Sequence, residues 1–210
     1  MKKFLFVAAV VALSAGSAAA STIKAQFWNA DRSFSTVDQA IAYADANAVT
    51  ATFESTVLNY PNQGNNVSSR NTTLADFLGP DAASLSGAGN TNLTTSVFRF
   101  EATLDLAPGA YKITVGSDDG YRLFFDGALV SERVRPRGFR DTVRLDVNVD
   151  GPTEFELYYY ENFGRTGVTF SINDVVVDSN IIAPIPIPAS LPLLLAGIGA
   201  FGIARRRAKA

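Results

Sequence analysis

The sequence contains no cysteine and no histidine, and this double absence limits the chemistry that the protein can perform. Without cysteine there is no disulfide framework, thiolate nucleophile or cysteine-ligated zinc. Without histidine the commonest general base is missing, which excludes Ser-His-Asp and Cys-His catalysis. A metal would have to be bound by oxygen atoms, and this favours calcium or magnesium over zinc or copper.

The first 20 of the 210 residues have the composition of a secretory signal peptide. Lys2 and Lys3 precede an apolar stretch over residues 4–13, and small residues follow, with Ala18 and Ala20 at the expected cleavage site. An uncleaved N-terminal anchor is the alternative, but the apolar run is short for a membrane span. We therefore expect export and a mature domain over residues 21–179.

The other end of the chain combines an apolar run with a basic cluster. Residues 189–204 are apolar or small apart from Ser190, and as a helix they would reach roughly 24 Å. Three arginines follow directly, and such a cluster keeps the end of a membrane segment on the cytoplasmic side. We expect a Pro-rich linker over residues 180–189 and a transmembrane helix with an Arg-rich tail over residues 190–210.

This C-terminal segment resembles the VPLPA variant of the PEP-CTERM sorting signal of Gram-negative bacteria. The matching residues are Pro186, Pro188, Ala189, Arg205, Arg206 and Arg207, with isoleucine at the positions that are Val and Leu in that motif. The resemblance implies transient insertion in the inner membrane, processing by an exosortase-type transpeptidase and release to the cell envelope, outer surface or extracellular matrix. A permanent single-span anchor is the alternative.

The charge of the mature domain argues against a nucleic-acid partner. Six basic residues lie in the two terminal segments. Without them the formal net charge falls from −2 to −8. Binding to nucleic acid needs a basic surface. The local basic stretch SERVRPRGFR, over residues 131–140, is instead interpreted as a solvated loop or a contact for acidic exopolysaccharide.

Short alternating segments dominate the rest of the chain and predict an all-β fold. Apolar and polar residues alternate over 97–104, 111–115, 121–125, 143–149, 155–160 and 168–172, with turn residues between them. Asp126-Gly127 is a strong hairpin signal, so Asp126 is interpreted as a turn residue. Residues 36–46 and 73–79 have helical spacing. The expected architecture is an antiparallel, jelly-roll-like β-sandwich with one or two short helices.

Two ordered blocks in this β-rich region resemble the protective-antigen-type (PA-fourteen) domain. They are GAYKITVGSDDGYRLFFDGALV over residues 109–130 and FELYYYENFGRTGVTFSI over residues 155–172. The family is a β-sandwich, and many of its members bind carbohydrate. The resemblance covers roughly residues 23–178, and it implies a carbohydrate-binding role at the cell surface or in biofilm matrix.

The adjacent acids Asp118 and Asp119 are the candidate metal ligands. In lectin-like members of this family such a pair coordinates Ca²⁺, which in turn binds sugar hydroxyls. Successive strand side chains point to opposite faces, so the two carboxylates can share one ion only if the backbone breaks that alternation, as a cis peptide bond would do. In the alternative interpretation, Asp118 caps a hairpin turn and Asp119 is solvated.

Three residues of the second block are candidate sugar contacts, namely Tyr160, Asn162 and Phe163. Exposed aromatic rings stack on sugar rings, and Asn162 is the match to a ligand of the family's second binding loop. An enzyme is not expected, because a glycosidase needs two carboxylates placed across a bound sugar, which neighbouring acids on one turn do not give; Glu161 with Asp119 is a possible pair, but nothing in the sequence singles it out. The prediction is a noncatalytic, exported carbohydrate-binding module; the alternative is a structural or adhesion protein without a small ligand.

Overall fold

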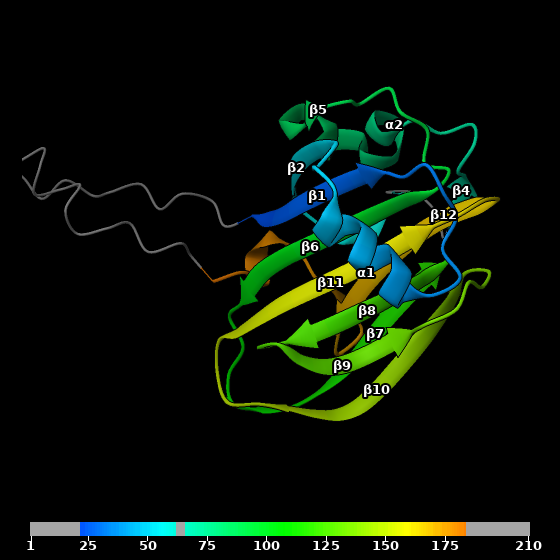
Figure 1. Cartoon of the computed structure of the whole chain (residues 1–210). Helices are drawn as coiled ribbons and strands as arrows, with labels where there is room; N and C mark the ends of the chain where they lie inside the picture. The colour runs from blue at the N-terminus through cyan, green and yellow to red at the C-terminus, as the bar shows by residue number, and fades with distance from the viewer. Residues whose placement is uncertain (1–21, 62–65, 184–210) are drawn as a thin grey trace, which may run out of the picture. The chain divides into compact units, whose positions relative to one another are not determined.

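Alternation along the strands decides which faces are buried, and it produces two antiparallel sheets packed face to face (Figure 1). The computed structural model describes residues 22–61 and 66–183. The predicted signal peptide, sorting motif and C-terminal helix lie outside these residues. Among the residues described, no helix is both long and apolar enough to cross a membrane.

The first sheet has seven strands and carries the centre of the domain. Its order is β5 (Ser86–Gly87), β2 (Ala51–Ser55), β1 (Ile23–Asn29), β6 (Ser96–Leu104), β11 (Thr153–Glu161), β8 (Gly120–Phe125) and β9 (Ala128–Arg133). Between β8 and β9, Asp126 and Gly127 have φ angles of 47° and 76°, as a two-residue Asp-Gly hairpin requires. The predicted hairpin is therefore confirmed.

The second sheet is built around β7 and β12. Its order is β10 (Arg140–Val149), β7 (Gly109–Asp118), β12 (Arg165–Ile172) and β13 (Val175–Val176), while β3 (Asn59–Tyr60) and β4 (Val67–Ser68) also pair with β12. The chain passes from this sheet to the first one directly after β7, because β8 belongs to the other layer. This crossing point is where Asp118 and Asp119 lie.

Aromatic side chains fill the space between the sheets. The ring of Phe98 lies 5.0 Å from that of Phe27, 5.5 Å from that of Tyr159 and 5.6 Å from that of Phe77, measured between centroids. Phe77 comes from α2 (Leu74–Leu78), which continues into the 3-10 helix η1 (Gly79–Ser84). The sandwich also extends past the predicted boundary at residue 179, because Ile182, after η2 (Ser179–Ile181), is buried in this core.

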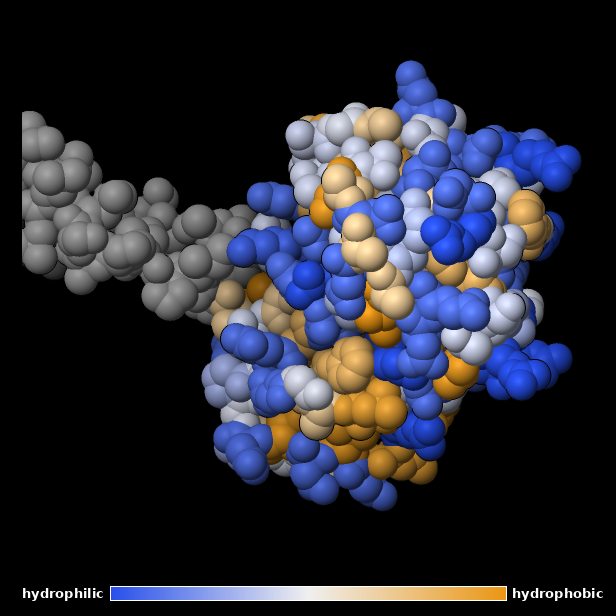
Figure 2. Space-filling model, in the orientation of Figure 1, coloured by the Kyte–Doolittle hydropathy of each residue, from blue (hydrophilic) through white to orange (hydrophobic). Residues whose placement is uncertain are grey.

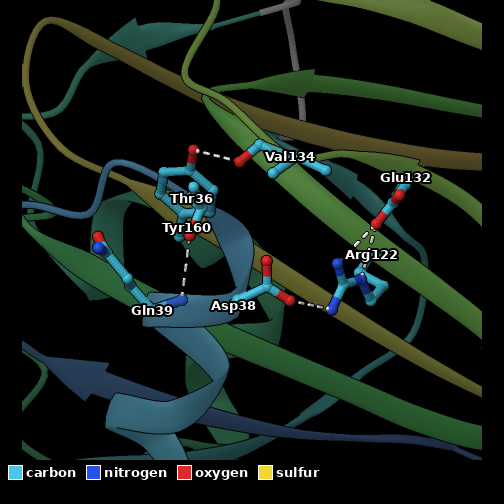
Figure 3. A network of polar contacts seen from close by, with 7 residues as sticks. All are labelled: Thr36, Asp38, Gln39, Arg122, Glu132, Val134 and Tyr160. Atoms are coloured by element: carbon cyan, nitrogen blue, oxygen red, sulfur yellow. Dashed lines mark hydrogen bonds and ion pairs between the residues drawn. The ribbon is translucent and has the colours of Figure 1, made fainter.

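Helix α1 (Val37–Ala46) covers the outer face of the first sheet, where it crosses β6, β8 and β11 (Figure 1). Its apolar side packs on a second buried cluster that includes Trp28, Val97, Tyr158 and Tyr160. Arg122 of β8 holds the polar side of the helix, since it binds Asp38 at 2.6 Å and Glu132 at 2.7 Å (Figure 3).

Thr36 caps α1, and its removal is expected to destabilise the protein moderately. Its hydroxyl accepts from the amide of Gln39, whose side chain accepts from the Ser35 amide at 2.8 Å (Figure 3 shows the first contact). Thr36→Ala should lower the free energy of unfolding by about 1 kcal/mol. Urea denaturation measures this loss, and Thr36→Ser, which keeps the hydroxyl, should recover most of it; equal losses in both variants would contradict the capping role.

Candidate functional site

Asp118 and Asp119 occupy the bend where the chain leaves β7 and enters β8. The peptide bond between them is cis, as the sequence analysis anticipated for a pair that acts together. Both side chains are nearly buried, with exposed fractions of 6% and 7%. One carboxylate oxygen of each lies within 4.8 Å of the other and of a carboxylate oxygen of Glu161. Three acids thus converge at one end of the sandwich.

Gly120 completes the bend because no side chain fits there. A Cβ atom at this position would lie 2.6 Å from the Arg133 carbonyl oxygen and 2.6 Å from a ring carbon of Tyr160. Both neighbours are fixed by the first sheet, so the Asp-Asp-Gly order follows from packing as well as from turn preference. A side chain here would push the Asp pair away from β11.

Each aspartate accepts a hydrogen bond from a neutral side chain, which in turn accepts one from an arginine. Asp118 accepts from the Asn66 side-chain amide at 2.9 Å, and the Asn66 oxygen accepts from Arg165 at 2.8 Å. The Asp119 carbonyl accepts from the Ser117 hydroxyl at 2.9 Å, and this hydroxyl accepts from Arg137 at 3.2 Å. These contacts orient the bend while placing both guanidinium groups outside direct ion pairing with it.

The Asp119 carboxylate also has direct backbone contacts. It accepts from the Asn162 amide nitrogen at 2.9 Å, which ties the bend to the end of β11. Burial raises the pKa of Asp119 to about 6, and the nearby Asp118 charge adds to this shift. Burial also raises the pKa of Asp118, while Asn66 and the two arginines oppose the rise. The site therefore favours neutral acids or a bound cation.

Glu161 is the most deeply placed acid of the three. Its side chain is fully buried, and neither carboxylate oxygen has a hydrogen-bond partner among the residues described. Burial, followed by the charge of Asp119, raises its pKa to about 9. From the sequence alone, Glu161 was expected to matter only as one half of a possible glycosidase pair. Glu161 alternates along β11 with Phe155, Leu157 and Tyr159, whose side chains point into the core, and this alternation could have predicted that Glu161 is buried.

The predicted sugar contacts differ in their accessibility. Phe163 lies on the β11–β12 loop and is 59% exposed, so its ring is available to a ligand. Tyr160 is fully buried, which corrects the expectation of an exposed stacking surface: α1 and Phe34 cover it, and its hydroxyl donates to the Val134 carbonyl at 3.1 Å (Figure 3). Its ring instead packs against Gly120 of the bend.

The side chain of Asn162 also makes hydrogen bonds within the protein. Its side-chain oxygen accepts from the Phe34 amide at 2.7 Å, and its side-chain nitrogen donates to the Phe34 carbonyl at 3.0 Å. Both ends of the side-chain amide therefore bind the segment that precedes α1 and not a ligand, whereas the backbone amide of Asn162 orients Asp119. Asn66 was missed, because nothing local in the polar loop over residues 59–71 marks one asparagine above the others.

The fold has well-defined structural relatives, although no family model and no curated protein matches the sequence. The chain is similar to the PA14 domain of the MpAFP antifreeze protein, with a TM-score of 0.67 and 21% identity over 78% of this chain and 89% of that one. For the PA14 sugar-binding domain of an RTX adhesin the TM-score is 0.65, with 24% identity over 80% and 100%. The chain has a PA14-type fold.

A more distant relative carries a sugar in its structure. The Epithelial Adhesin 6 A domain from Candida glabrata, in complex with Galb1-3GlcNAc, has a TM-score of 0.55 and 12% identity over 81% of this chain and 89% of that one. These similarities establish the sandwich architecture. The residues of this chain decide the chemistry of the site, and its donor set of buried carboxylate oxygens suits a hard divalent cation.

Proposed function

We propose that this protein is a noncatalytic carbohydrate-binding module that uses Ca²⁺ held by Asp118 and Asp119. The observation that carries the proposal is the convergence of buried carboxylates at the bend between β7 and β8. Ca²⁺ prefers 6–8 oxygen ligands, and vicinal sugar hydroxyls complete such a shell. When bound, the ion would supply a fixed positive charge for those hydroxyls, while the exposed Phe163 offers apolar area beside them.

The cellular setting of this proposal follows from the ends of the sequence. We infer export through the inner membrane, processing by an exosortase-type enzyme at the Pro186–Ala189 motif, and a final place at the envelope, outer surface or matrix of a Gram-negative bacterium. The sugar-binding and adhesin descriptions of the structural relatives support a surface role. In that setting, a glycan or exopolysaccharide is the partner.

Binding to a glycan array tests this function directly. The protein should bind a subset of immobilised glycans in calcium buffer, and a chelator should remove that binding, because the ion bridges the carboxylates and the sugar. Returning calcium in excess should restore the same pattern. An array that stays blank with and without calcium would overturn the carbohydrate-binding proposal.

An adhesion module without a small ligand is the second candidate, and an exposed apolar surface favours it. Leu129 on β9 and Val143 and Leu145 on β10 are 53%, 47% and 67% exposed, and both strands lie at sheet edges. Figure 2 shows apolar residues gathered over the part of this face where β8, β9 and β10 lie in Figure 1. Such surfaces mark protein contacts. This function predicts protein-protein binding and a melting temperature indifferent to calcium.

A further inference from the structure

We propose that Glu161 is a third carboxylate ligand of the cation, reaching it from inside the sandwich. The inference rests on the proposed function and adds the residue that closes the inner side of its metal site. Asp118 and Asp119 approach from the bend, whereas Glu161 approaches from the end of β11, with one oxygen of each acid within 4.8 Å of the others.

Glu161 is buried without a hydrogen-bond partner for its carboxylate in the part of the chain that the structure describes. It is fully buried, and both of its oxygens are unsatisfied among the residues described. The Ser69 hydroxyl lies near enough to lower the pKa of Glu161 by hydrogen bonding, but it donates to the Gly164 carbonyl at 3.4 Å and provides no charge. A buried carboxylate is stable only with a counter-charge or donors. A cation supplies the missing counter-charge.

A second buried acid in the same domain shows what a structural carboxylate looks like. Asp81 is 6% exposed, and it accepts hydrogen bonds from the Tyr60 hydroxyl, the Thr56 hydroxyl at 2.7 Å and the Thr56 amide at 3.2 Å. The sequence thus provides several donors where it buries an acid for structure. Within the described part of the chain, neither oxygen of Glu161 has such a donor at hydrogen-bonding distance, although the residue is buried more completely and lies beside two other acids.

The three acids lie in or next to strands of both sheets. Asp118 ends β7 of the second sheet, Asp119 precedes β8 of the first, and Glu161 ends β11, which pairs with β8. An ion held by all three joins the two layers at this end of the sandwich. Three carboxylates leave several of its 6–8 coordination positions open for sugar hydroxyls, water and backbone oxygens.

Two substitutions separate a ligand from a merely buried acid. Glu161→Gln keeps the shape but removes the charge, and Glu161→Met keeps the length but removes both oxygens. Glu154→Gln is the matched control, because Glu154 lies on the same strand but is exposed. The readouts are Ca²⁺ affinity by calorimetry and the lifetime of bound Tb³⁺ luminescence in H₂O and D₂O, which counts the water molecules on the ion.

Both Glu161 variants should bind Ca²⁺ at least about tenfold more weakly than the wild type and the control. The Tb³⁺ lifetimes should report at least one additional bound water in Glu161→Met. Without metal, Glu161→Gln should melt at the wild-type temperature or above it, because its buried acid is gone; this keeps the test decisive even where Glu161→Met folds poorly. A structural role alone would instead lower the melting temperature and leave affinity unchanged.

The outcomes distinguish this inference from the function on which it rests. A wild-type protein that binds neither Ca²⁺ nor Tb³⁺ overturns the cation-dependent function itself. A wild-type protein that binds both, with unchanged affinity and water count in both Glu161 variants, overturns only the role of Glu161.

Discussion

Replacing Asp119 with asparagine is expected to abolish calcium-dependent glycan binding. Asparagine has the same size, and its side-chain oxygen can still accept from the Asn162 amide that now lies 2.9 Å from the carboxylate. The fold should therefore persist, while the site loses one negative charge and one strong oxygen ligand. Ligand charge sets Ca²⁺ affinity over orders of magnitude, so the loss should be on the order of 100-fold.

Calorimetry and thermal melting measure the two consequences of Asp119→Asn. At a calcium concentration about 100 times its dissociation constant, a site that binds only the folded protein adds about 2.7 kcal/mol to the free energy of unfolding. The wild type should show this gain as a higher melting temperature, and Asp119→Asn should not. Asp118→Asn should behave in the same way, since the two acids share the bend.

Asp126→Asn provides the matched control for the Asp119 variant. Asp126 lies in the β8–β9 hairpin with a φ angle of 47°, a conformation that asparagine also tolerates. Its carboxylate accepts from the Glu154 amide at 2.9 Å, and an asparagine oxygen can keep that contact. Affinity for calcium and glycan should be unchanged. A loss of binding equal to that of Asp119→Asn would assign the effect to general charge rather than to the bend.

The sequence predicted those parts of the fold that depend on neighbouring residues. Alternation identified the strands, the Asp-Gly pair identified the β8–β9 hairpin, and helical spacing identified α1 and α2, because each signal lies within a few residues. The paired acids at 118 and 119 were found for the same reason, since adjacency itself raised the question of a shared role. Local patterns of this kind do not depend on how the two sheets pack together.

The parts that the sequence did not predict depend on contacts between distant segments. Tyr160 alternates like an exposed residue, but α1 covers it, and no local pattern shows where a short helix docks. Asn162 binds Phe34, which lies 128 positions away, and Asn66 reaches Asp118 across 52 positions. The site was therefore predicted in its two central residues, whereas its supporting contacts and its third acid became evident only from the packing.

The three acids also give the protein an expected dependence on pH that disappears when calcium is bound. Glu161 faces Asp118 and Asp119 across the site, with the Tyr159 hydroxyl beside the bend and Arg137 and Arg165 beyond it. Burial raises the pKa of Glu161 to about 9 and that of Asp119 to about 6 in the folded protein. In the unfolded chain both acids return to ordinary values near 4.

For the metal-free protein, the free energy of unfolding should therefore fall as pH rises. Below about pH 4 both acids are neutral in both states, and neither affects the balance. Between about pH 4 and about 9 the unfolded chain binds fewer protons than the folded one, so stability declines with pH. The slope is at most about 1.4 kcal/mol per pH unit for each group, and it should persist to about pH 9 only through Glu161.

Calcium should remove this decline, because it binds the ionised carboxylates and so leaves the folded and unfolded chains with equal numbers of protons on these acids. Affinity rises as the acids lose their protons, so the calcium-induced gain in melting temperature should be small near pH 5 and large near pH 9. Melting curves across that range, on protein stripped of metal and on protein in excess calcium, measure both trends. Glu161→Gln should flatten the metal-free decline above about pH 7, where Asp119 is already ionised. Parallel curves with and without calcium would show that these acids do not share an ion, since proton and metal must compete for the same oxygens.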